Sequence, residues 1–219
     1  MSMEEKIIEH LKNRYNPSAI ILHGSRAIGK AREHSDWDFL MLFHELPKPP
    51  DFREIVNGQN IEVISLSADI SDDGVINEMG TKLQNARVVF DSENNGDRVL
   101  NAAKAHYAKG FSWPDTWPSG PKLFMASKID GMSDYVSEQE IFQKYLGTFY
   151  ERALNYWYQV IHKKFSQPVY LAVETIKNED PEYFAHLSAL ASSGATNQKK
   201  IEHAQKIHGK LFGFSNQKN

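Results

Sequence analysis

The chain has 219 residues and a formal net charge of −3, and it contains no cysteine. The lack of cysteine excludes disulfide scaffolds, thiolate metal sites and thiol nucleophiles, and it is typical of a protein of the reducing cytoplasm, the expected location. The slightly acidic balance argues against a binder of duplex nucleic acid, which needs many cations, and favours a small-molecule partner. The charged residues in the N-terminal turns argue against a signal peptide and against a membrane span there.

Helices and strands alternate in the first half of the chain. Hydrophobic periodicity and turn residues separate the elements, including the Pro-rich break "ELPKPPD". The pattern predicts helices over about residues 3–15 and 72–86, and strands over residues 18–24, 36–43, 60–67 and 87–91. This alternation indicates an α+β or α/β domain.

The second half shows only helical spacing. The stretch "SWPDTWPSGP", residues 112–121, contains three prolines and predicts a loop at a domain boundary. Ser137 and Glu140 have the spacing of a capping box, which predicts a long helix that runs to about Phe165. Further helices are expected over about residues 168–178, 181–192 and 197–212. The prediction is therefore a first domain over residues 1–110, a linker over 111–121 and a helical bundle over 122–219.

Two carboxylates open the second predicted strand. Asp36 and Asp38 lie two residues apart, so their side chains point to the same face of a strand while Trp37 points to the other. Two like charges about 4 Å apart repel by roughly 4 kcal/mol at an effective dielectric constant near 20. A shared proton, a basic side chain or a divalent cation could relieve this repulsion. An all-oxygen ligand set favours Mg²⁺ or Mn²⁺ among the cations.

A turn that suits a phosphate precedes the two aspartates. Gly24 ends the first predicted strand and permits a tight turn, and Ser25 and Arg26 begin a short predicted helix with free backbone N–H groups. These donors would face an anion such as a triphosphate. Arg26 has two open interpretations, as a triphosphate contact or as the partner of an acidic side chain.

A third carboxylate lies early in the third predicted strand. Two-metal phosphoryl or nucleotidyl transfer commonly uses a third acid to hold the ion that activates the attacking hydroxyl. Glu62 shares a strand face with Ile64 and Leu66, where a charged residue in an apolar run is unusual. If the second and third predicted strands pair, Glu62 converges on Asp36 and Asp38; the alternative is an edge-strand carboxylate that faces water.

This combined pattern resembles the DNA polymerase β-like nucleotidyltransferase superfamily. The resemblance rests on Gly24-Ser25, ten intervening residues, Asp36-x-Asp38 and the later strand acid Glu62, and it is specific over about residues 18–67. Within the superfamily, the chain looks most like small bacterial nucleotidyltransferases, such as aminoglycoside adenylyltransferases and the minimal nucleotidyltransferases of toxin–antitoxin pairs. The resemblance implies an α+β fold, with a mixed sheet and packed helices, ahead of the all-α bundle.

The resemblance also implies an activity. Asp36, Asp38 and Glu62 would be catalytic and would bind Mg²⁺ or Mn²⁺, and Gly24, Ser25 and Arg26 would bind the nucleotide, expected to be ATP. AMP would pass to a hydroxyl of a small acceptor, possibly an aminoglycoside-like antibiotic, with release of pyrophosphate. Alternatives are a regulatory enzyme that modifies a protein or tRNA, and a non-catalytic nucleotide-binding module.

The helical half would supply the acceptor side of the site. In aminoglycoside-modifying relatives a carboxylate from that half acts as general base, and the candidates here are Glu151, Glu138 and Asp134. A homodimer is expected by analogy alone. No pattern in the sequence identifies the acceptor.

Overall fold

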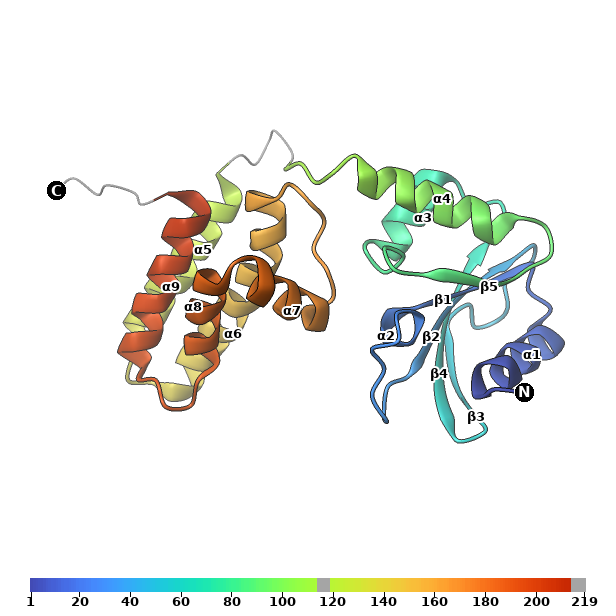
Figure 1. Ribbon diagram of the computed structural model, residues 1–219, viewed down its shortest axis with the longest axis horizontal. Helices are drawn as coiled ribbons and strands as arrows, with labels where there is room; N and C mark the ends of the chain where they lie inside the picture. Colours follow the sequence, from blue (N-terminus) through green and yellow to red (C-terminus); the bar gives the residue numbers. More distant parts are fainter. Residues whose placement is uncertain (114–118, 214–219) are drawn as a thin grey trace. The chain divides into compact units, whose positions relative to one another are not determined.

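The computed structural model describes residues 1–113 and 119–213, and Figure 1 shows how its helices and strands are arranged. The chain divides into two compact units, Met1–Lys109 and Gly110–Asn219. Residues 114–118 of the predicted linker lie outside the described residues, and its last two residues belong to helix α5 (Gly120–Asp134). None of the helices in the described parts of the chain is both long enough and apolar enough to cross a membrane.

The first unit is built on a mixed five-stranded sheet with the strand order β3-β4-β2-β1-β5. Strands β2 and β4 run parallel, whereas the pairs β1–β2, β1–β5 and β3–β4 are antiparallel. The strands are β1 (Ala19–His23), β2 (Trp37–Phe43), β3 (Phe52–Val56), β4 (Gln59–Ser67) and β5 (Arg87–Asp91). The predicted α+β class with a mixed sheet is confirmed.

Helices cover both faces of this sheet (Figure 1). Helix α1 (Met3–Tyr15) packs Ile7 and Leu11 against one face, beside Phe39 of β2. Helices α3 (Asp72–Met79) and α4 (Asn95–Ala108) cover the opposite face, where Leu40 is buried. The two clusters follow the alternation of side chains along each strand, so neighbouring residues of β2 belong to different cores.

The second unit is all-helical around one apolar core. The long helices α5, α6 and α9 lie side by side, with α7 and α8 beside them (Figure 1). Besides α5, the helices are α6 (Gln139–Tyr156), the π-helical turn η1 (Trp157–Ile161), α7 (Val169–Glu179), α8 (Pro181–Ala191) and α9 (Asn197–Phe212). Phe149, Trp157 and Tyr183 are fully buried in the core. The expected helical second half is confirmed.

The structure contains a strand that the sequence analysis missed. Strand β3 follows the Pro-rich break directly and forms a hairpin with β4. The turn of this hairpin is Asn57-Gly58, and both residues have positive φ angles, 52° and 78°. Asn-Gly is the strongest short-range signal for such a turn, so the hairpin had a signature in the sequence.

Three predicted helix boundaries are wrong. Helix α3 ends at Met79 because Gly80 terminates it with a φ of 52°, well before the expected end near residue 86. The predicted capping box does not form, since the residue before α6 is Glu138 and no side chain caps that end among the described residues. Regular α-helix ends at Tyr156, where the chain enters the π-helical turn.

Candidate functional site

A row of four ionisable side chains crosses the sheet of the first unit. The strand registers place His23 opposite Asp38, Asp38 opposite Glu62, and Glu62 opposite Arg53. Residues paired in this way point to the same face of a sheet, here the face that α3 and α4 cover further along the strands. The register thus brings two of the predicted acids, Asp38 and Glu62, side by side.

The Gly-Ser turn lies directly against this row. Gly24 begins the short helix α2 (Gly24–Ala27) with a φ of 70°, a conformation that favours glycine. A Cβ atom at this position would overlap a carboxylate oxygen of Asp38, so the close approach also requires glycine. No side chain caps the start of α2 among the described residues, which leaves its first backbone N–H groups available to an anion.

Arg26 supports the chain that carries the aspartates. Its Nε and Nη2 atoms donate hydrogen bonds to the backbone oxygen of Ser35, at 3.1 and 2.6 Å, and its guanidinium stacks 4.4 Å from the ring centre of Trp37. The Ser35 hydroxyl accepts a hydrogen bond from the backbone N–H of Arg32, as expected for a turn-capping residue. The Arg26 guanidinium therefore binds the backbone just before Asp36, and it has no ion pair with an acid among the described residues.

Asp38 has an unfavourable electrostatic environment for a carboxylate. Partial burial, and then the negative charges of Glu62 and Asp36, raise its pKa from 3.8 to about 6, against the opposing effects of Lys82 and Arg26. This dependence indicates that Glu62 and Asp36 each lie within electrostatic range of Asp38. Asp36 is exposed and precedes β2, so it is the least constrained of the three.

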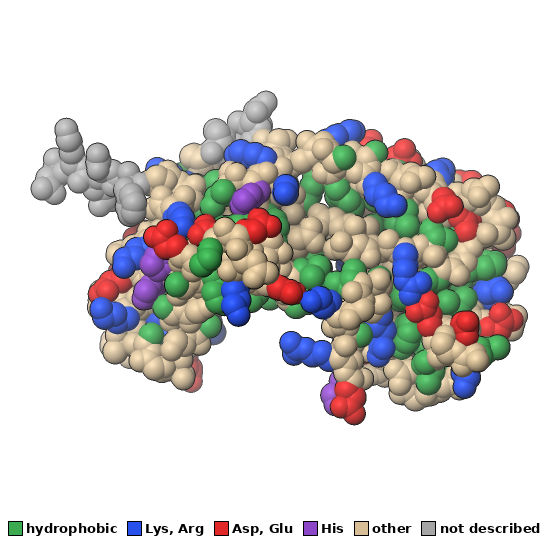
Figure 2. All heavy atoms as spheres, in the orientation of Figure 1, with side chains coloured by type: hydrophobic (Ala, Val, Ile, Leu, Met, Phe, Trp, Pro, Cys, Tyr) green, Lys and Arg blue, Asp and Glu red, His purple; other side chains and the backbone are tan. Residues whose placement is uncertain are grey.

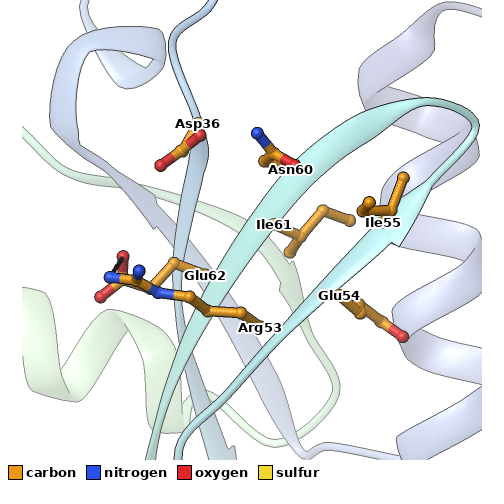
Figure 3. A pocket seen from close by; sticks show the side chains of 7 residues that line it. All are labelled: Asp36, Arg53, Glu54, Ile55, Asn60, Ile61 and Glu62. Atoms are coloured by element: carbon orange, nitrogen blue, oxygen red, sulfur yellow. Dashed lines mark hydrogen bonds and ion pairs between the residues drawn. The ribbon is translucent and has the colours of Figure 1, made fainter.

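Glu62 forms an ion pair with Arg53, the residue opposite it on β3. The Arg53 Nη2 atom lies 2.8 Å from a Glu62 carboxylate oxygen, and Figure 3 shows the two side chains meeting. Both residues line a cavity of about 290 Å³. Asp36 lines the same cavity. Among the described residues, no group of three or more Asp, Glu, His or Cys side chains is already arranged to hold a metal ion. The three predicted ligands are thus near one another, but Glu62 is engaged elsewhere.

Sequence reasoning missed three residues at this site. His23 is 7% exposed, its Nε2 atom has no hydrogen-bond partner among the described residues, and burial together with the charge of Lys82 lowers its pKa to about 4. Lys82 acts electrostatically on both His23 and Asp38 from the turn after α3. Arg53 lies on the missed strand. His23 could have been found from its position beside the Gly-Ser turn, but nothing local marks Lys82.

The donor set fits a hard divalent cation. Three carboxylates supply only oxygen, the ligand type that Mg²⁺ and Mn²⁺ prefer. Burial, and then the negative charges of Glu62 and Asp36, raise the pKa of Asp38, and a cation would relieve the repulsion between these acids. Asp36, Asp38 and Glu62 are therefore the residues that would hold the ion, once Glu62 is released from Arg53.

Comparison with known proteins finds a family model that matches the sheet of the first unit. Residues 5–94, which include every strand of the sheet, match the family model described as "Polymerase beta, Nucleotidyltransferase". No curated protein matches the chain. A solved structure of a nucleotidyltransferase-like protein from Exiguobacterium sibiricum 255-15 is similar at 12% identity and a TM-score of 0.47, over 96% of this chain and 74% of that one, a level that carries no weight here. The first unit of the chain is therefore similar to the nucleotidyltransferase domains that this polymerase β family model describes.

Proposed function

We propose that the protein transfers a nucleoside monophosphate, AMP from ATP, to a hydroxyl group of a small-molecule acceptor. A bond forms between the acceptor oxygen and the α-phosphorus, the bond from that phosphorus to the bridging oxygen breaks, and pyrophosphate leaves while the hydroxyl loses its proton. The observation that supports this most strongly is the cluster of Asp36, Asp38 and Glu62, with the pKa of Asp38 raised to about 6, beside an uncapped glycine turn.

Each residue of the site has a role in this proposal. Asp36 and Asp38 would hold the cations, and Glu62 would complete their set of carboxylate ligands. A bound Mg²⁺ or Mn²⁺ supplies neutralisation of phosphate charge and activation of the attacking hydroxyl. Ser25 and the first N–H groups of α2 bind the β- and γ-phosphates, and Gly24 allows the backbone to approach Asp38.

Arg53 and Arg26 act on the acids in different ways. Arg53 neutralises Glu62 while no cation is bound, through the 2.8 Å ion pair. Arg26 keeps the Asp36 end of the loop in place through the backbone of Ser35. Asp38 and Glu62 could then receive a cation without any change in the sheet, because only the exposed side chain of Arg53 would have to move.

The distribution of charged side chains on the surface is compatible with a small acceptor. On the face shown in Figure 2, basic and acidic side chains are interspersed and the basic ones do not gather in one continuous patch. Duplex nucleic acid would need such a patch to replace its counterions. An aminoglycoside-like antibiotic is one acceptor of this class. The alternative functions are transfer to a protein, transfer to a tRNA end, and nucleotide binding without transfer.

Transfer from α-labelled ATP tests the proposal. The full-length protein is incubated with Mg²⁺, the labelled nucleotide and a panel of aminoglycosides and other small alcohols, with Asp38→Asn as the inactive control. We expect label on a small acceptor and free pyrophosphate from the wild type alone. Label on a protein or RNA would support the regulatory alternative, and binding of nucleotide without transfer to any acceptor would contradict an enzymatic function.

A further inference from the structure

Two histidines meet across the packed helices α8 and α9 of the second unit. His186 of α8 and His203 of α9 are both half-buried, and their Nδ1 atoms lie 2.9 Å apart. The ring centres are 5.1 Å apart and the ring planes are inclined by 48°, so the rings meet through these nitrogens and do not stack. Neither residue belongs to the candidate site of the first unit.

The two histidines border the apolar seam between the helices. Leu187, next to His186, and Ala204, next to His203, are buried in the core of the unit. A helical side chain next to a buried position lies at the edge of the interface, where an imidazole is partly shielded and still reaches water. The packing of α8 on α9 thus holds both rings where protons can reach them.

A hydrogen bond between two Nδ1 atoms needs one proton and one lone pair. A neutral imidazole has N–H on one nitrogen and a lone pair on the other, whereas a protonated imidazole has N–H on both. With both rings neutral, one Nδ1 donates to the other, and with one ring protonated the same hydrogen bond is charge-assisted. With both rings protonated, two N–H groups face each other and two positive charges repel. The contact therefore survives the first proton and is lost with the second.

The surroundings of His186 disfavour that second proton. Partial burial, and then the charges of His203 and Lys206, lower the pKa of His186, against the opposing effect of Glu182. Lys210 of α9 also lowers this pKa, and it forms an ion pair with Glu182 at 2.9 Å. Within the described residues, neither imidazole has an ion pair with an acid that would hold a second positive charge.

We infer that His186 and His203 form a proton-sensitive contact between α8 and α9, which is kept while at most one ring is protonated and is lost when both are. The apolar seam stays buried in either state, so loss of the contact loosens the edge of the helix pair without unfolding the unit. This inference is separate from the proposed nucleotidyl transfer and does not depend on it.

NMR of the full-length, ¹⁵N-labelled protein tests the hydrogen bond itself. At about pH 7.5, above the ordinary pKa of histidine, we expect a scalar coupling between the two Nδ1 nuclei, because one proton joins them. The coupling should disappear by about pH 4.5, where both rings are protonated. Absence of the coupling at about pH 7.5, or its persistence at about pH 4.5, would overturn the inference.

Two variants separate the proton from the hydrogen bond. His203→Asn keeps a hydrogen-bonding group that does not titrate, and His203→Leu removes both. Hydrogen-exchange protection factors of the α8 amides report local opening of this helix. Between about pH 7.5 and 4.5 they should fall about threefold more in the wild type than in either variant, as the loss of one hydrogen bond predicts.

The two variants should also differ from each other and from a control. Protection at about pH 7.5 should be lower in His203→Leu than in His203→Asn, because only the asparagine keeps a partner for His186. His34→Asn, a substitution of an exposed histidine in the first unit, should behave as the wild type. Equal pH dependence of α8 protection in the wild type and His203→Asn would overturn the inference, whatever the outcome of the transfer assay.

Discussion

Asp38 in the sheet unit and Asp180 in the helical unit show two ways to hold the same side chain. Asp180 accepts hydrogen bonds from Lys210 Nζ at 2.8 Å, from the Tyr183 N–H at 3.0 Å and from Trp157 Nε1 at 3.4 Å. Although burial opposes it, these partners lower the pKa of Asp180. Asp38 instead is partly buried and faces two other acids, and these effects raise its pKa to about 6.

The difference separates structural acids from those available for chemistry. Asp180 caps α8, and its bonds are all satisfied from within the protein, so its charge stabilises the fold. Asp38 has no such hydrogen-bond partner among the described residues, so its charge costs stability in the folded domain. Sites of this second kind are where perturbed pKa values indicate function.

Removal of the two charges should affect catalysis very differently. Asp38→Asn should lower nucleotidyl transfer by a factor of about a thousand or more, because a lost metal ligand removes several kcal/mol of transition-state stabilisation. Asp180→Asn removes the same charge from the structural site and should retain transfer within a few-fold. Label transfer from α-labelled ATP measures both, and equal losses in the two variants would erase the distinction.

The two sites should also differ in their effect on the free energy of unfolding, which should fall in an Asp180 variant and rise in an Asp38 variant. Asp180→Ala removes a helix cap and an ion pair and should lower the free energy of unfolding by about 1–2 kcal/mol. Asp38→Asn should raise it by about 1 kcal/mol at pH 7, a value reduced for the solvent screening of a half-exposed group. Urea unfolding at pH 7 measures both changes. A destabilised Asp38→Asn variant would mean that Asp38 has stabilising partners after all.

The stability gained by Asp38→Asn should disappear in acid. Because the folded-state pKa of Asp38 is raised, the folded protein binds more protons than the unfolded chain between about pH 4 and 6. The wild type therefore loses stability relative to Asp38→Asn as the pH rises through that window, and the two should be equally stable near pH 4. The depressed pKa of Asp180 predicts the reverse for that residue, with stability lost only below its unfolded value of 3.8. Unfolding curves at several pH values measure this, and a difference that does not change with pH would contradict it.

A smaller effect is expected at Arg53. Arg53→Met should tighten Mn²⁺ binding by a factor of about 1.4 to 5, since an exposed ion pair contributes about 0.2–1 kcal/mol that the cation must overcome. The matched control is Arg87→Met, which removes the Arg87–Glu4 ion pair elsewhere on the same unit and should leave Mn²⁺ affinity unchanged. Weaker Mn²⁺ binding in Arg53→Met would instead make Arg53 part of the ligand shell.

Much of the sheet unit was predictable from local patterns. The apolar runs around β1, β2 and β4 and the spacing of Gly24, Asp36, Asp38 and Glu62 led to the correct fold class, because strand periodicity and turn chemistry are local. The Asn57-Gly58 hairpin was also visible in the sequence, and the prolines before it obscured the short strand β3.

The remainder of the site depends on contacts between distant segments. The Arg53–Glu62 pair needs the β3–β4 register, and the effect of Lys82 on Asp38 joins segments 44 residues apart. Charge environment, unlike strand periodicity, is set by the tertiary structure.

Cation binding by Asp36, Asp38 and Glu62 is tested most directly by Mn²⁺ titration followed by electron paramagnetic resonance. Wild type, Asp38→Asn and Asp180→Asn are each titrated in the presence of a non-hydrolysable ATP analogue. We expect wild type and Asp180→Asn to bind Mn²⁺ with the same affinity and Asp38→Asn to lose at least tenfold. Equal Mn²⁺ affinity in all three proteins, or none in any of them, would contradict a metal-dependent site at these acids.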